Sequence, residues 1–227
     1  MLQGMPRADS HAARLDAFYG PQAAHYDRFR ERLLHGRAEL IGSLRLPPDA
    51  HVIEFGAGTG NNLRYFGASA RDFRRVELVD LCAPLLDIAR SRYAGLPHVH
   101  AVHADATRYR PTQAADCVLF AYSLSMIPDW RAALVNALAC LRPGGTLAVV
   151  DFHIAPPHPA PGFSRHDWLT RQFWPRWFAH DGVHLRPQLL PTLCAAVPLH
   201  EKVESRGPVP GLPGLSVPWF RFSGVRA

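Results

Sequence analysis

Lysine is almost absent from this chain of 227 residues, in which Lys202 is the only one. The net charge of +6 therefore comes from arginine, which suits recognition of phosphate and carboxylate groups but can equally reflect genomic base composition. Long apolar runs are absent as well. No segment reaches the ~20 apolar residues of a membrane-spanning helix, and the N-terminus lacks the apolar core of a signal peptide.

Cysteine is sparse, and its spacing argues against a disulfide framework. The four residues Cys82, Cys117, Cys140 and Cys194 lie far apart in mostly apolar surroundings. Such cysteines are typical of buried free thiols in a reducing compartment. With 48% hydrophobic and 19% charged residues, the chain is large enough to bury a full core. We expect one cytoplasmic domain over 1–227, and peripheral contact with the inner face of a membrane stays open.

Glycine is concentrated in one stretch, HVIEFGAGTGNNL over 51–63, where it follows an apolar strand. Gly56, Gly58 and Gly60 let the backbone turn sharply and approach a ligand closely. The next helix is expected to begin at Asn61, and its free N–H groups attract ligand anions. The stretch is therefore a candidate ligand-binding turn.

The spacing of this turn distinguishes between nucleotide ligands. A dinucleotide fingerprint reads G-x-G-x-x-G, whereas here the third glycine comes one residue early. Glu54 stands two residues before the first glycine, where a carboxylate would repel a pyrophosphate. The same carboxylate suits a ligand that carries an ammonium and a sulfonium, as S-adenosylmethionine (SAM) does. The pattern E-x-G-x-G-x-G resembles motif I of the Rossmann-like methyltransferases.

Two more carboxylates follow predicted strands. Asp80 ends the strand 75–80, where it can accept hydrogen bonds from both ribose hydroxyls or instead cap the helix that starts near Pro84. Asp105 follows the strand 99–103 and fits the adenine amino group, with the Ala106 N–H donating to the ring. Three histidines at 98, 100 and 103 do not share one face of that strand, so we expect no metal site.

The alternation of strands and helices continues through a strand over 115–122, a helix over 129–141, a turn at 142–145 and a strand over 146–152. This order predicts an α/β fold with a Rossmann-like, doubly wound, mostly parallel seven-stranded sheet, which binds ligands at the carboxyl ends of its strands. The candidate cofactor-binding residues are Glu54, Gly56, Ala57, Gly58, Gly60, Asn61, Asp80, Leu81, Asp105, Ala106, Tyr122 and Ser123.

The remaining segments flank this predicted SAM-binding core over 50–153. Residues 1–14 are polar, order is expected from Leu15, and one helix is predicted from Ala23 to Leu44 within a helical cap over 15–46. Tyr26 and Arg30 of the cap either contact SAM or are a core aromatic and a solvated charge. An aromatic insert over 154–184 and a C-terminal helix with strands over 185–227 complete the chain.

Four strings carry a narrower resemblance: YSLSMIPDW at 122–130, FYGPQ at 18–22 with YDRFR at 26–30, VDF at 150–152, and WLTRQFWPRWF at 168–178. With RGPVP at 206–210 and VPWFRF at 217–222, they resemble the methyltransferase half of betaine lipid synthase and the stand-alone bacterial diacylglycerylhomoserine N-methyltransferase. The resemblance implies SAM-dependent N-methylation of a lipid head-group amine. A separate aminocarboxypropyl transferase would supply the substrate.

The aromatic insert has three interpretations. Tryptophans and phenylalanines alternate there with Arg165, Arg171 and Arg176. A nucleic-acid surface is not favoured, because the chain has no RNA-binding module and no long basic stripe. The segment is either core, or a lid over the acceptor pocket that also faces anionic lipid, with tryptophans at the head-group level.

The chemistry requires an amine to attack the SAM methyl group in line with the departing sulfur, which is mainly a task of positioning. Asp151, Tyr26 and Tyr122 are the candidate catalytic residues that could take the amine proton, although none is identified as the base. Tyr122, Phe152 and Trp168 are candidates to surround the methylated cation. Methylation of phosphatidylethanolamine or of a small metabolite, and SAM binding without turnover by a regulatory subunit, remain alternatives.

Overall fold

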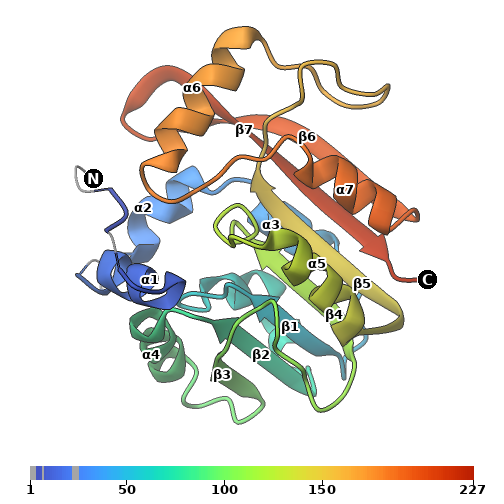
Figure 1. Ribbon diagram of the computed structural model, residues 1–227. Coiled ribbons are helices and arrows are strands. Elements are labelled where there is room, and N and C mark those ends of the chain that lie inside the picture. Colours follow the sequence, from blue (N-terminus) through green and yellow to red (C-terminus); the bar gives the residue numbers. More distant parts are fainter. Residues whose placement is uncertain (1–3, 7, 22–25) are drawn as a thin grey trace.

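A seven-stranded sheet in the order β3-β2-β1-β4-β5-β7-β6 runs through the molecule, with helices on both faces (Figure 1). The computed structural model describes residues 4–6, 8–21 and 26–227, without the side chains of Tyr26, Arg28 and Phe29. Strands β1 to β5 are parallel, and β7 is antiparallel to both β5 and β6. The predicted Rossmann-like, mostly parallel sheet is confirmed.

The strands are β1 (His51–Phe55), β2 (Arg75–Asp80), β3 (Val99–His103), β4 (Ala115–Ala121), β5 (Leu141–Phe152), β6 (His200–Val209) and β7 (Leu212–Val225). The helices are α1 (His11–Tyr19), α2 (Tyr26–Leu33), α3 (Arg37–Ser43), the 3-10 helix η2 (Asn61–Arg71), α4 (Ala83–Arg92), α5 (Trp130–Cys140), α6 (Trp168–Ala179) and α7 (Leu189–Ala196).

The central strands are buried on both faces, because their alternate side chains enter two separate cores. In β4, Leu119 faces the core formed with α3 and η2, and Phe120 faces the core formed with α5 and α7. Both side chains are fully buried. The same alternation in β1 and β5 fixes the register, so that the carboxyl ends of the parallel strands meet at one edge of the sheet.

The N-terminal region differs from its prediction in two ways. Order begins before Leu15, since α1 starts at His11 and the Ser10 side chain caps it by accepting from the Ala13 N–H at 3.1 Å. The single helix predicted over 23–44 is two helices, and its first three residues lie outside the described part. The break falls at Gly36, whose φ of 77° and tight packing on the Trp219 ring suit no residue with a Cβ.

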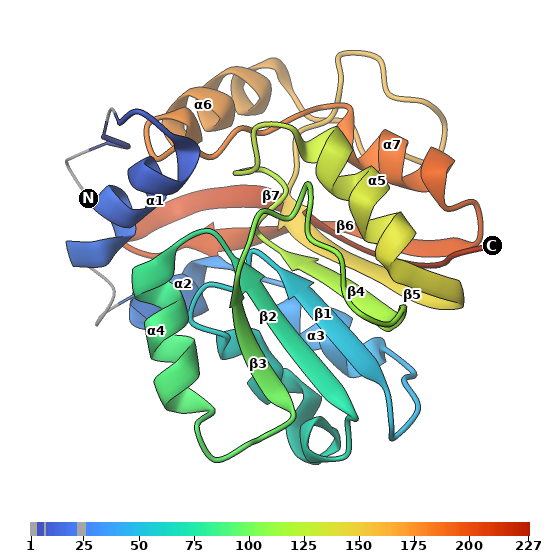
Figure 2. The same cartoon turned by 60° about the horizontal axis from the view of Figure 1, so that its bottom comes forward.

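Helix α6 lies between β5 and α7 in sequence and close to the N-terminal segment in space (Figure 2). The Met5 N–H donates to the His180 carbonyl, just past the end of α6, at 2.9 Å. The loop that follows returns to the strand ends, where the His184 N–H donates to the Ser125 carbonyl at 2.8 Å. Within the described ranges, no helix has both the length and the apolarity needed to cross a membrane.

Candidate active site

A cavity of about 330 Å³ opens where β1, β2, β3 and β4 end, beneath α1 and α2. It brings together seven of the predicted residues, which are Gly56, Asp80, Leu81, Asp105, Ala106, Tyr122 and Ser123. The other predicted cofactor residues, Glu54, Ala57, Gly58, Gly60 and Asn61, lie in or beside the same turn but are not among the residues that line the cavity.

The glycine turn is packed tightly enough that its shape depends on glycine. Gly56 has a φ of 71°, and a Cβ at this position would collide with the Ser123 side chain. The Ser123 hydroxyl donates to the Phe55 carbonyl at 2.7 Å, which fixes the end of β1 against the end of β4. Gly56 therefore lets a cavity ligand approach the backbone closely.

Asp80 joins the turn to the next helix. Its carboxylate accepts from the Gly58 N–H at 2.7 Å and from the Cys82 N–H at 2.8 Å, and burial raises its pKa. The first N–H of α4, at Ala83, is instead capped by the Asp16 carboxylate of α1 at 3.0 Å. Asp80 thus lies on the cavity wall without capping α4 through its first N–H.

The segment after β3 is held by side-chain hydrogen bonds. Asp105 accepts from the Thr107 N–H and from the Thr107 hydroxyl, each at 2.8 Å. The buried Asn136 amide of α5 donates to the carbonyls of Ala106 at 2.8 Å and Tyr109 at 2.9 Å. These bonds hold the Asp105–Ala106 pair at the cavity, beside Asp80 at the neighbouring strand end.

Glu54 is buried below the turn at the end of β1, and it is 3% exposed. Its carboxylate accepts from the Asn62 amide at 2.6 Å, and Asn62 in turn accepts from the Arg37 guanidinium at 2.9 Å. Burial raises the Glu54 pKa to about 7, against the opposing effects of Asn62 and Arg37. A carboxyl group with such a pKa responds to any cation that binds nearby.

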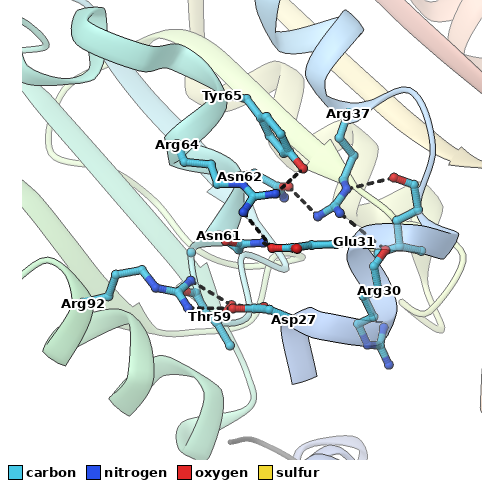
Figure 3. Close-up of polar contacts among 12 residues, drawn as sticks. Asp27, Arg30, Glu31, Arg37, Thr59, Asn61, Asn62, Arg64, Tyr65 and Arg92 are labelled. Atoms are coloured by element: carbon cyan, nitrogen blue, oxygen red, sulfur yellow. Dashed lines mark hydrogen bonds and ion pairs between the residues drawn. The ribbon is translucent and has the colours of Figure 1, made fainter. Parts of the chain in front are cut away.

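Helix α2 is fastened to the turn by two polar clusters (Figure 3). Asp27 accepts from the Thr59 hydroxyl at 2.7 Å and from the Arg92 guanidinium at 2.6 Å. Glu31 accepts from the Arg64 guanidinium at 2.7 Å and from the Asn61 amide at 3.3 Å. The helical cap is thereby attached to the glycine turn, to η2 and to α4.

Tyr122 lines the cavity, its backbone is strained, and its hydroxyl is already hydrogen-bonded within the protein. It has a φ of 57°, the only positive φ among the described non-glycine residues. Its hydroxyl donates to the His35 carbonyl at 2.7 Å, and burial raises its pKa well above the usual range. The phenol therefore stays protonated near neutral pH, so it is poorly suited to take a proton from an amine.

Asp151, a second candidate catalytic residue, does not line the cavity. It is fully buried at the end of β5. It accepts from the Ser125 hydroxyl at 2.6 Å, the Ser125 N–H at 2.9 Å and the Phe152 N–H at 2.8 Å, and burial raises its pKa to about 6. Its role here is to hold the loop after β4. Tyr26 begins α2, and its side chain lies outside the described residues.

The predicted aromatic cage is only partly assembled. The rings of Tyr122 and Phe152 meet with centroids 4.6 Å apart, and Phe178 packs on Phe152 at 4.3 Å. Trp168, the third predicted member, is 67% exposed and does not line the cavity. None of the described α6 side chains lines the cavity. Helix α6 therefore does not form the predicted lid over the acceptor pocket in this structure.

Sequence reasoning missed the contribution of α1. Tyr19 is buried at the cavity, and its hydroxyl donates to the Met126 sulfur at 3.3 Å. The predicted contact Arg30 reaches the cavity too, with its guanidinium 5.0 Å from the centre of the Tyr19 ring. His11 of α1 also lines the cavity, and burial lowers its pKa. The capping Ser10 and the four-residue spacing of Leu15 and Tyr19 are the sequence signals for this helix.

The cavity wall combines two kinds of groups. Asp80 at the end of β2 and Asp105 just after β3 are acidic, whereas Tyr19 and Tyr122 are aromatic and Arg30 is cationic. In the described part of the chain, no three His, Cys, Asp or Glu residues are grouped as a metal site would require. The four cysteines are free, and all except Cys194 are buried.

Comparisons with known proteins agree with this geometry. The family model described as "Methyltransferase domain" matches residues 24–193. Trans-aconitate 2-methyltransferase of Acidovorax ebreus is 30% identical over 128 residues, which are 56% of this chain and 47% of that protein. The ubiquinone/menaquinone biosynthesis C-methyltransferase UbiE of Bordetella parapertussis is 29% identical over 74% of this chain and 67% of its own length.

A solved structure extends the likeness to the whole sheet. The 1,6-didemethyltoxoflavin-N1-methyltransferase of Burkholderia thailandensis, with S-adenosylhomocysteine bound, aligns with a TM-score of 0.65 at 21% identity. The match covers 98% of this chain and 92% of that one, and at this identity it shows the fold alone.

The fold and the family match together define a class I SAM-dependent methyltransferase fold. The chain belongs to the methyltransferase domain family, and the expectation of SAM as its cofactor is confirmed. Its match spans about half the length of the first curated relatives. The narrower resemblance to the betaine lipid enzymes stays a prediction.

Proposed function

We propose that this chain transfers the methyl group of SAM to the amine of a lipid head group, with diacylglycerylhomoserine as the acceptor. The observation that carries the proposal is the mixed wall of the cavity, in which two carboxylates at strand ends near the glycine turn are combined with two tyrosines and Arg30. SAM suits the carboxylates, and a small amine that also carries an anionic group suits the aromatic rings and the arginine.

Each acidic residue at the cavity has a role that its contacts support. Asp80 would accept from the ribose hydroxyls while Gly58 and Cys82 hold its carboxylate in place. Asp105 and the Ala106 N–H would read adenine. Glu54 would balance the ammonium of the methionine moiety from below, because a nearby cation favours its ionised form.

For the transfer itself, positioning of the acceptor supplies most of the catalysis. The amine nitrogen forms a bond to the methyl carbon as the carbon–sulfur bond breaks, so the sulfonium charge moves to nitrogen and neutral sulfur leaves. Tyr19 and Tyr122 offer aromatic faces to the cation that forms. Arg30 would bind the carboxylate of the homoserine head group. Before each transfer the proton of the acceptor ammonium leaves to solvent, since the Tyr122 hydroxyl is engaged by His35.

A second candidate is O-methylation of a small carboxylic acid. The relative named trans-aconitate 2-methyltransferase and the position of Arg30 at the cavity both favour it. The two candidates share recognition of a carboxylate by Arg30 and differ in the atom that is methylated. A lipid acceptor additionally requires a separate enzyme to attach the aminocarboxypropyl group.

The test is transfer of a labelled methyl group from SAM by the purified chain to acceptors offered separately. Diacylglycerylhomoserine in detergent micelles, phosphatidylethanolamine in the same micelles and trans-aconitate in solution are the three arms. We expect label in the trimethylated homoserine lipid. Label in trans-aconitate alone assigns the second candidate, and tight SAM binding by calorimetry without label in any arm contradicts all of these acceptors.

A further inference from the structure

Helix α6 has two different faces. Thr170, Trp174 and Phe178 recur every four residues, and they are 9%, 3% and 5% exposed. Trp168 and Leu169 near the N-terminus of α6 are 67% and 66% exposed, and Trp177 near its C-terminus is 47% exposed. We call the exposed surface of α6 its outer face: Leu169, Gln172 and Arg176 lie along it, and Trp168 and Trp177, which point about 180° apart, lie at its two edges.

The outer face is unusual for this molecule. The other three tryptophans of the chain, Trp130, Trp174 and Trp219, are no more than 9% exposed. Of the eight large hydrophobic side chains that are exposed in the described part, three belong to this one face. Single exposed apolar residues scattered over a surface are ordinary, whereas a cluster of them marks a surface that binds an apolar partner. The exposed tryptophans and leucine of α6 form such a cluster.

The charges around the outer face favour an anionic partner. Residues 165–180 contain three arginines and a single acid, Asp167. Arg165 and Arg176 are exposed, and the Arg176 guanidinium is held along the helix by the Gln172 carbonyl at 2.8 Å and the Gln172 side chain at 2.6 Å. Asp167 accepts from the Thr170 N–H at 2.7 Å, so its charge is engaged at the N-terminus of α6.

Helix α6 is joined to the cavity region by short connections. Just past its C-terminal end, the His180 carbonyl accepts from the N–H of Met5, in the segment that leads into α1. The loop after α6 is bonded through His184 to Ser125, next to Met126 on the cavity wall. Figure 2 shows α6 beside this N-terminal segment.

We propose that the outer face of α6 docks on an anionic lipid bilayer. Trp168, Leu169 and Trp177 would lie at the head-group level, where amphipathic aromatic rings are favoured. Arg165 and Arg176 would lie near lipid phosphates. This surface goes beyond the proposed methyl transfer and does not depend on it, although docking would bring the cavity close to acceptors in the membrane.

The experiment is co-sedimentation of the purified chain with vesicles of phosphatidylcholine alone, or of phosphatidylcholine mixed with phosphatidylglycerol. We expect binding to the mixed vesicles that weakens as salt is added, because salt screens the attraction over about 10 Å. R165Q combined with R176Q should weaken binding about fivefold for each arginine removed. W168S combined with W177S should weaken it by at least about tenfold.

The matched control is V135S combined with L199S, which removes apolar side chains that are 68% and 72% exposed elsewhere on the surface. The control should bind as the unchanged chain does, and all variants should keep their melting temperature and affinity for S-adenosylhomocysteine. Equal binding to both kinds of vesicle, or equal loss in the control, overturns the proposal. A dimer in solution that W168S dissociates would assign the face to a second copy of the chain instead. Methyl transfer to a micellar acceptor is measured without vesicles. A failure of the proposed methyl transfer can therefore be told apart from a failure of the docking proposal.

Discussion

Trp168 and Trp174 lie six residues apart on α6, yet the first is 67% exposed and the second only 3%. An α-helix turns by about 100° per residue, so the two rings point in directions about 120° apart. Trp174 packs on Phe178 with ring centroids 5.7 Å apart, in the core above the sheet. One short helix therefore carries both a structural tryptophan and a surface tryptophan.

The first prediction separates these two roles. Trp174→Ala should lower the free energy of unfolding by about 3–5 kcal/mol, since it empties a packed site. Trp168→Ala should change it by less than about 0.5 kcal/mol, as surface changes do. Urea denaturation of both variants measures this difference. An equal loss of stability would mean that Trp168 is covered in the folded protein.

The second prediction concerns Glu54 and pH. Its pKa is about 7 in the folded protein and near 4.5 when unfolded, so the folded state holds the proton more tightly. Ionisation therefore costs stability as pH rises from about 4.5 to about 7. Glu54→Gln cannot ionise. Its stability relative to the unchanged chain should rise by about 2–3 kcal/mol between about pH 5 and about pH 8.

Glu54→Gln should also remove the pH dependence of cofactor binding. Ionised Glu54 attracts the ligand ammonium, so affinity for S-adenosylhomocysteine should increase with pH in the unchanged chain and stay flat in Glu54→Gln. Calorimetry at several pH values measures both. A pH-independent affinity in the unchanged chain would place Glu54 out of electrostatic reach of the ligand.

The third prediction is that Asp80→Asn weakens S-adenosylhomocysteine binding by about 10- to 100-fold, since hydrogen bonds to a charged group contribute about 1.5–3 kcal/mol. NAD should not bind to either protein. Asp87→Asn is the control, because Asp87 lies on α4 with a side chain that is 71% exposed. If the affinity of Asp80→Asn is unchanged, Asp80 does not bind the ligand, and its role is limited to its hydrogen bonds with the N–H groups of Gly58 and Cys82.

The fourth prediction is that Tyr122→Phe keeps methyl transfer within about threefold and lowers the unfolding free energy by about 1 kcal/mol, the typical contribution of one hydrogen bond. The hydroxyl that is lost donates to the His35 carbonyl and not to a ligand. Single-turnover rates and denaturation measure the two effects. A rate loss of a hundredfold without a loss of stability would restore Tyr122 as a catalytic residue.

Local patterns in the sequence carried most of the fold. The strands β1 to β4 could be predicted because apolar residues recur in each, and Asp80 and Asp105 could be predicted because they stand at or just after the end of a strand. The bounds of helix α5 were predicted within one residue, and the structure adds that Asp129 is its N-cap. These features depend on residues close together in the chain, so spacing alone is informative.

Features that depend on distant residues could not be read in this way. The Tyr122 hydroxyl meets a carbonyl 87 residues away, and Arg37 reaches Asn62 across 25 residues. The aromatic content of α6 was plain, but the spacing could not say whether Trp168 faced a cavity or solvent. Asp151 lies near the end of its strand as Asp80 does, yet the loop after β4 engages both of its carboxylate oxygens.

The position of β7 between β5 and β6 has a consequence for synthesis of the protein. Strand β6 pairs only with β7 within the described sheet, and β7 ends at Val225. While the ribosome is still making residues 212–225, β5 has an open edge and β6 has no place in the sheet. Folding of this half therefore waits for residues 212–225, and until then the exposed edge of β5 is where a chaperone or another unfolded chain would meet the nascent chain.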